Sequence, residues 1–78
     1  ETTISFTLKE NTLSLKLCIF NIKGQLVKTL YAGPLQKGQH SLIWKGTDEL
    51  GYQVSSGVYF YRLSNGNETS QRKMVLMK

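Results

Sequence analysis

The residues of this chain that could do chemistry are few and stand apart from one another. His40 is the only histidine and Cys18 the only cysteine. Nucleophilic catalysis needs a nucleophile, a base and a group that orients the base, and nothing in the sequence places Ser41 or Cys18 beside His40 in that way. Cys18 lies in an alternating apolar stretch, so we interpret it as a small semi-buried hydrophobe. The sequence therefore predicts a domain without catalytic residues.

The acidic residues offer little more for a metal or a cofactor. Asp48 and Glu49 are adjacent, but Ca²⁺ usually takes about six to eight oxygen ligands. We interpret Asp48 as a turn residue that accepts hydrogen bonds from local amides, with a calcium site as the alternative. Gly46, Gly51 and Gly57 do not predict a phosphate loop, because no helix is expected after them. We expect neither a metal nor a cofactor.

The net charge of +5 raises the possibility of a nucleic-acid partner. The basic residues are scattered, however, and only Arg72 and Lys73 are adjacent. Isolated lysines on strands are the usual means of keeping solvent-facing surfaces and strand edges soluble. The sequence therefore predicts no nucleic-acid partner, and a general affinity for anionic surfaces is the alternative.

Length and hydropathy indicate one small domain. The 78 residues contain no run near the ~20 apolar residues that a membrane-spanning helix needs, and no basic-then-apolar leader precedes the first strand pattern. That strand pattern begins almost at Glu1. We therefore expect residues 1–78 to be a single domain excised from a larger exported protein, with no transmembrane segment.

Apolar and polar residues alternate along most of the chain with the period of two that is typical of half-buried β-strands. The expected strands cover residues 3–9, 13–20, 26–31, 40–44, 58–63 and 69–77, with Val54 leading toward the fifth. Gly33-Pro34 is expected to end a strand, because proline cannot donate to a ladder, and Asn65-Gly66 predicts a hairpin. About seven strands at spacings of about 8–12 residues predict an antiparallel β-sandwich or barrel.

The core of such a sandwich is expected to form around Trp44. One buried indole removes about 150–250 Å² of surface from water, more than most side chains in this sequence. We expect Leu15, Leu17, Ile19 and Tyr59 to be buried between the sheets with it, because each lies on an apolar face of an expected strand.

Three segments of the chain carry a family resemblance: NIKGQLVKTL (21–30), WKGTDELGYQVSSGVYFYRL (44–63) and KMVLMK (73–78). Their most specific parts are the Trp-x-Gly-x-Asp-x-x-Gly loop, the Ser-Gly-Val-Tyr strand entry and the Lys-Met-Val ending. The chain resembles the type A C-terminal sorting domain of the type IX (Por) secretion system. The same pattern overlaps the immunoglobulin-like domain of the flagellar hook-capping protein. The residues of this shared structural motif are Gly24, Trp44, Gly46, Asp48, Gly51, Ser56, Gly57 and Tyr59.

This resemblance implies an immunoglobulin-like β-sandwich with a function that involves no catalysis. Such domains end exported proteins of Gram-negative bacteria, behind an N-terminal cargo domain. The outer-membrane type IX translocon recognises them in the periplasm, and a sortase-like peptidase commonly removes them as the cargo reaches the cell surface or the medium. The essential signal maps onto the last strand, that is, onto Lys73, Met74, Val75, Leu76, Met77 and Lys78.

The chain departs from the family pattern at two places, and other functions stay open. It lacks the Pro-Asn-Pro-rich lead that commonly precedes the first strand, and Lys45 stands where an acidic residue is frequent. The alternatives are a structural or carbohydrate-associated module of a secreted enzyme and the hook-cap domain itself. The apolar run at the end of the chain has its own alternative, which is that it only completes the core.

Overall fold

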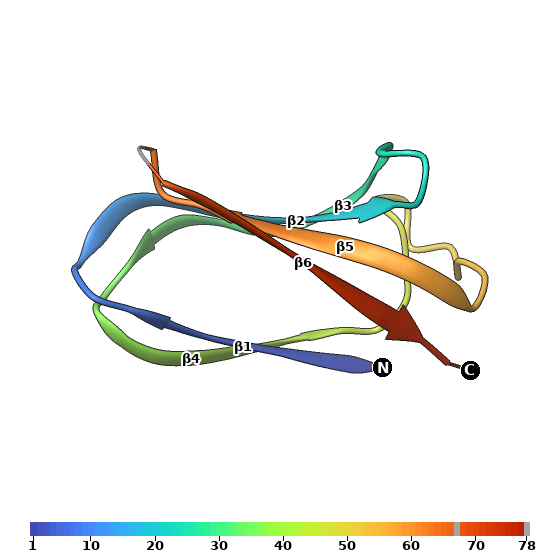
Figure 1. The fold of residues 1–78 in the computed structure, drawn as a ribbon, viewed down its shortest axis with the longest axis horizontal. Helices are drawn as coiled ribbons and strands as arrows, with labels where there is room; N and C mark the ends of the chain where they lie inside the picture. Colours follow the sequence, from blue (N-terminus) through green and yellow to red (C-terminus); the bar gives the residue numbers. More distant parts are fainter. Residues whose placement is uncertain (67, 78) are drawn as a thin grey trace.

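The structure, a computed structural model, describes residues 1–66 and 68–77. In this part of the chain, two antiparallel sheets pack face to face (Figure 1). The strands are β1 (Thr2–Leu8), β2 (Thr12–Asn21), β3 (Leu26–Leu35), β4 (Gly38–Trp44), β5 (Gly57–Ser64) and β6 (Thr69–Leu76). One sheet pairs β1 with β4, and the other has the order β3-β2-β5-β6. The predicted all-β antiparallel sandwich is confirmed.

Strand β3 differs from its prediction, because it continues through Gly33 and Pro34 to Leu35. The reason lies in the order of the sheet. β3 is an edge strand that pairs only with β2, and its register with β2 shifts between Thr12 and Leu15, opposite Pro34. An edge position next to a bulge is where a sheet tolerates a residue that has no amide hydrogen.

The described residues form six strands, one fewer than the number suggested by the spacing of the turns. The segment between β4 and β5 is a loop with a single isolated bridge, between Thr47 and Gln53. The amide of Val54 donates to the carbonyl of Gly46 at 2.9 Å, within the same loop. Because this loop satisfies its backbone groups locally, Val54 does not extend a strand toward β5.

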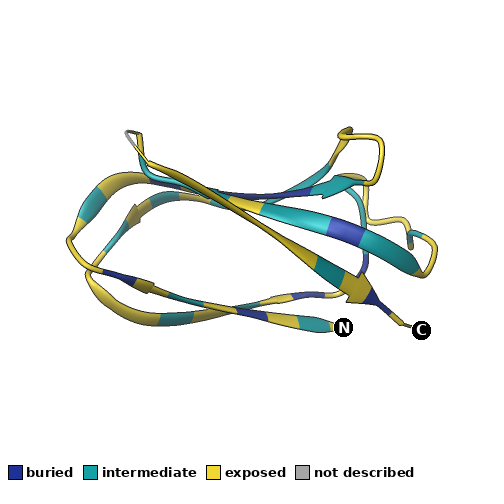
Figure 2. Ribbon diagram, viewed as in Figure 1, coloured by how far each residue is buried: buried dark blue, intermediate teal, exposed yellow. Residues whose placement is uncertain are grey.

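The core lies where the two sheets face each other, and it contains all five of the predicted residues. Figure 2 shows the buried positions recurring along β1, β2, β5 and the end of β6. The buried cluster consists of Ile4, Leu17, Ile19, Trp44, Tyr59 and Leu76, and Leu15 is also buried. The rings of Trp44 and Tyr59 meet edge to face, with 5.1 Å between their centroids. This geometry is the one that the charge distribution of aromatic rings favours.

The polar atoms of these two aromatic residues are satisfied within the loop between β4 and β5. Trp44 Nε1–H donates to the carbonyl of Thr47 at 2.9 Å, and the Tyr59 hydroxyl donates to the carbonyl of Ser55 at 2.7 Å. A buried donor without a partner would destabilise the core. The loop between β4 and β5 therefore supplies the hydrogen-bond acceptors that the buried Trp44 and Tyr59 need. The described residues include no helix that is long and apolar enough to span a membrane.

Candidate functional site

Asp48 organises the loop that follows β4. Its Oδ1 accepts hydrogen bonds from the amides of Leu50 and Tyr52, each at 3.0 Å. The amide of Gly51 donates to the Asp48 carbonyl at 3.0 Å, and Gly51 has a φ of 87°, a conformation that favours glycine. The interpretation of Asp48 as a turn residue that binds local amides is confirmed.

Glu49 points away from Asp48 and binds the edge of β3. Its amide donates to the carbonyl of Val27 at 3.1 Å, and its carboxylate accepts a hydrogen bond from the amide of Thr29. The two adjacent carboxylates therefore serve different parts of the backbone. Among the described residues, no three His, Cys, Asp or Glu side chains gather in a way that could hold a metal ion.

Gly46 brings the same loop against the end of β6. Its backbone has a φ of 75°, and a Cβ atom placed on it would lie 3.2 Å from Cδ2 of Leu76 and 3.5 Å from Cδ1. The positive φ favours glycine here, and a Cβ atom would fit only if the Leu76 side chain shifted slightly. The sequence indicates Gly46 as a motif residue, but nothing in the sequence indicates that Leu76 is its neighbour.

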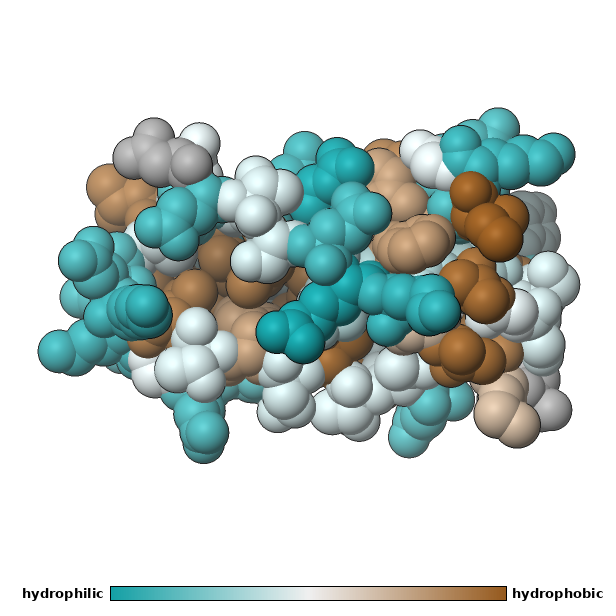
Figure 3. Space-filling model, in the orientation of Figure 1, coloured by the Kyte–Doolittle hydropathy of each residue, from teal (hydrophilic) through white to brown (hydrophobic). Residues whose placement is uncertain are grey.

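The end of β6 has two faces with different roles. Met74 is half-buried and pairs with Tyr59, and Leu76 is buried and pairs with Gly57. Val75 and Met77 are 56% and 80% exposed. Figure 3 shows apolar side chains gathered on the surface at the end of the molecule where β6 finishes. The terminal run thus completes the core with one set of side chains and presents apolar groups to solvent with the other.

Of the predicted sorting segment, five residues lie in the described part of the chain. Lys73 is exposed in β6, opposite Phe60 of β5, and is followed by Met74, Val75, Leu76 and Met77. Lys78 lies outside the described residues. The structure brings this segment together with three of the motif residues, Gly46, Gly57 and Tyr59.

The remaining motif residues shape the turns at the same end of the sandwich. Gly24 has a φ of 81°, and its amide donates to the carbonyl of Asn21 at 2.9 Å in the turn between β2 and β3. Ser56 is exposed just before β5. Gly24 therefore lies in a turn, and Ser56 lies beside the start of β5.

His40 and Cys18 lie on different sheets and do not form a site together. His40, in β4, has its Nε2 2.7 Å from the carbonyl of Gln36 and its ring against Phe6. Cys18, in β2, is buried, with its sulfur 3.7 Å from Oγ1 of Thr29. Both residues make structural contacts, and neither is placed beside the other groups that nucleophilic catalysis would need.

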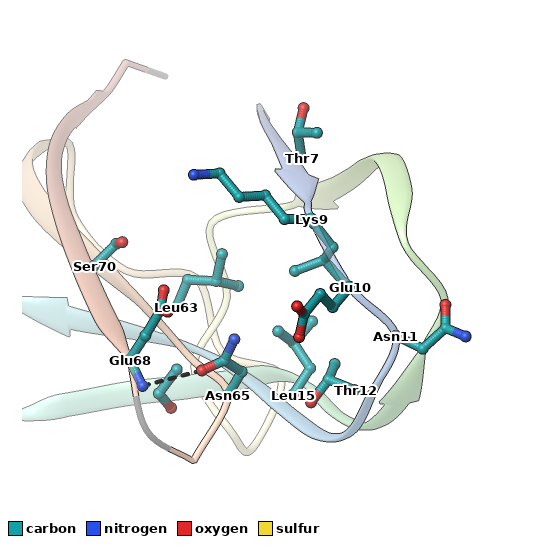
Figure 4. A pocket seen from close by; sticks show the side chains of 12 residues that line it. Thr7, Lys9, Glu10, Asn11, Thr12, Leu15, Leu63, Asn65, Glu68 and Ser70 are labelled. Carbon is teal, nitrogen blue, oxygen red and sulfur yellow. Dashed lines mark hydrogen bonds between the residues drawn. The ribbon is translucent and has the colours of Figure 1, made fainter.

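A cleft that the sequence analysis did not foresee opens at the other end of the sandwich, between β1 and β6 (Figure 4). Its volume is about 470 Å³. Its apolar lining residues are Leu8, Leu15 and Leu63, and its polar ones include Lys9, Glu10, Asn65, Glu68 and Ser70. Asn65 Oδ1 is bound by the amide of Glu68 at 3.0 Å. The cleft exists because the two-stranded sheet covers only part of the four-stranded one.

A comparison with models of known protein families shows to which family this chain belongs. The family model of the FlgD Ig-like domain matches residues 1–69. The chain belongs to the FlgD Ig-like domain family. This confirms the resemblance to the immunoglobulin-like domain of the hook-capping protein. Family membership makes the chain a non-catalytic Ig-like β-sandwich module.

The fold of this FlgD Ig-like domain is also found in a solved structure. The crystal structure of FlgD from P. aeruginosa superposes with a TM-score of 0.70 at 22% sequence identity. The alignment covers 95% of this chain and 58% of that one, so the chain spans little more than half of the length of FlgD. At this identity the likeness shows a shared fold. A comparison with curated protein sequences found no match.

Proposed function

We propose that this domain is a non-catalytic sorting module that directs an exported bacterial protein through the type IX outer-membrane translocon. The observation that carries the proposal is the arrangement of side chains at the end of β6. Met74 and Leu76 anchor the strand in the core, while Val75 and Met77 project from it into solvent. A terminal strand with this arrangement is held rigidly and still offers apolar groups to a receptor.

The rest of the sandwich holds this segment in place. Leu76 fills the space above Gly46, and Gly57 pairs with Leu76 across the ladder. The Trp-x-Gly-x-Asp-x-x-Gly loop therefore fixes where the segment lies. In this proposal, the strongest motif of the sequence is needed for presentation of the signal, and the signal itself lies at residues 73–78.

The proposal extends to partners and location. The translocon binds the domain in the periplasm of a Gram-negative bacterium, and a sortase-like peptidase separates the domain from an N-terminal cargo. The cargo then reaches the cell surface or the medium. The FlgD family match ends at residue 69, so the segment proposed as the address lies beyond the sequence that the family match describes, although the superposition on the P. aeruginosa FlgD covers 95% of this chain.

A reporter fusion tests the export role. The domain is placed at the C-terminus of a periplasm-directed reporter in a bacterium that has a type IX system, and the reporter is measured in the medium. We expect secretion that requires both the domain and an intact translocon. Retention of the fusion in the periplasm, with the domain folded, would contradict the proposal.

The family match favours a second candidate, in which the domain is an assembly module of a hook cap. In that case the domain acts through contacts with other subunits of a flagellar structure. The same fusion separates the two candidates, because a hook-cap module gives no translocon-dependent secretion in a bacterium without flagella.

A further inference from the structure

The two edges of the four-stranded sheet differ in whether another segment of the chain covers their backbone groups. At the β3 edge, Glu49 binds the backbone of Val27 through its amide and that of Thr29 through its carboxylate. Lys28 Nζ lies 3.4 Å from Oγ1 of Thr47 in the same loop. The loop between β4 and β5 therefore occupies backbone groups that another strand would need. An edge covered in this way does not recruit a further strand.

The β6 edge has no such cover within residues 1–66 and 68–77. β6 pairs only with β5, and no other described segment donates a backbone hydrogen bond to its outer side. Figure 1 shows β6 running across the near side of the molecule with no loop over it. Eight residues, Thr69–Leu76, thus present one row of backbone groups to solvent.

The charges beside this edge select the partner. Arg72 and Lys73 are exposed neighbours in β6, and Arg62 of β5 holds the side chain of Gln71 through two hydrogen bonds, of 3.3 and 3.2 Å. In the described chain, neither Arg72 nor Lys73 lies within ion-pair distance of a carboxylate. A second copy paired along β6 would bring these cations near their equivalents, which is unfavourable. An acidic strand would be attracted.

The cleft between the sheets supplies the second element of recognition. Ser70 of β6 lines it together with Leu8, Leu15 and Leu63. Figure 3 shows apolar side chains at the bottom of a hollow on the same face, at the end away from the C-terminus. Lys9, Glu10 and Glu68 also line the cleft, so its charges are of both signs, and Leu8, Leu15 and Leu63 favour an apolar residue over it.

We infer that the outer edge of β6 accepts an extended segment of a partner protein as an added strand, with apolar residues over the cleft and acidic residues beside Arg72 and Lys73. Main-chain hydrogen bonds to β6 supply affinity, and the alternating side chains supply selectivity. The inference is independent of the export role, because a strand can be added to this edge in a hook cap or a spacer as well.

Synthetic peptides test the chemistry of the partner. The probe is a labelled ten-residue peptide with alternating Val and Thr at one end and consecutive Glu residues at the other, because Arg72 and Lys73 project to opposite faces of β6. A twin carries Lys in place of Glu, and a third version has methylated backbone nitrogens. Fluorescence anisotropy at low salt is expected to show the acidic peptide binding at least about tenfold more tightly than its Lys twin. The methylated version is expected not to bind.

Two sets of variants locate the site. In Arg72→Glu/Lys73→Glu, the preference is expected to move to the Lys twin, whereas Lys37→Glu/Lys45→Glu, with the same change of net charge at exposed positions elsewhere, is expected to keep it. Successive backbone amides of a strand point to opposite sides. Of Ser70→Pro and Gln71→Pro, one therefore removes an amide that faces β5, and the other removes an amide on the outer side of β6. The variant of this pair that keeps the thermal transition of the parent is expected to lose binding.

Three results would each overturn the inference. One is equal binding of the acidic and Lys peptides. Another is unchanged binding to the folded proline variant, which would place the peptide elsewhere. The third is a β6-dependent dimer in sedimentation experiments, which would make a second copy the occupant. Since all of these are measurements on the purified domain, they are independent of whether the reporter fusion is secreted.

Discussion

A methyl carbon of Leu76, Cδ2, lies 3.2 Å from the point where a Cβ atom would stand on Gly46. This contact joins the loop after β4 to the end of β6, two segments 30 residues apart that belong to two of the three segments that carry the family resemblance. It shows that the motif glycine provides the space into which the terminal strand packs.

The contact predicts that substitution by alanine destabilises the domain more at Gly46 than at Gly51. Gly46→Ala combines an unfavourable positive φ with a tight contact against the methyl groups of Leu76, so we expect the free energy of unfolding to fall by about 2–4 kcal/mol. Gly51→Ala has a φ of 87° but nothing within 4 Å of the new Cβ, and should lower it by about 1–2 kcal/mol. Urea denaturation measures both, and equal losses would contradict the packing described here.

Leu76→Ala should remove the cause of that difference. Truncating this buried side chain is expected to lower the free energy of unfolding by about 2–5 kcal/mol. In the Leu76→Ala background, Gly46→Ala should cost no more than Gly51→Ala, because the methyl groups that crowd the new Cβ are gone. A double-mutant cycle from urea titrations gives the coupling, and additive losses would show that Gly46 and Leu76 act independently.

Trp44 is expected to be inaccessible to solvent. Its side chain has 0% exposure, so aqueous iodide should barely quench its fluorescence until the protein unfolds. Trp44→Ala should lower the free energy of unfolding by about 3–5 kcal/mol, through lost burial and the resulting cavity. Efficient quenching of the native protein would contradict the described core.

Glu49 is expected to protect the β3 edge. Glu49→Ala removes the carboxylate that binds the amide of Thr29, so we expect a loss of about 1 kcal/mol and an increased tendency to self-associate. Glu10→Ala, which makes the same change of charge at an exposed position, is the control. Sedimentation velocity at a series of concentrations measures association, and identical behaviour of the two variants would argue against edge protection.

The local pattern of the sequence was enough to predict the class of fold and the centre of the core. Alternation placed Leu15, Leu17 and Ile19 on one buried face, and the position of Asp48 before a glycine indicated its turn. The continuation of β3 past Pro34 was not predictable, because proline is tolerated only at an edge and strand order is a property of the whole sheet. The role of Glu49 and the cleft beside β6 depend in the same way on tertiary contacts.

The export account rests on the outward side of the terminal strand, and one measurement tests it directly. The test variant, Val75→Thr/Met77→Gln, replaces two exposed apolar groups with polar ones of similar size. The control variant, Leu13→Gln/Leu50→Gln, makes the same kind of change in other parts of the domain, at positions that are 90% and 80% exposed. Both pairs should change the free energy of unfolding by about 0.5 kcal/mol or less per residue. In the reporter fusion, we expect the Val75/Met77 pair to abolish secretion and the Leu13/Leu50 pair to leave it unchanged. Normal secretion of the folded Val75/Met77 variant would contradict the claim that this face is the address.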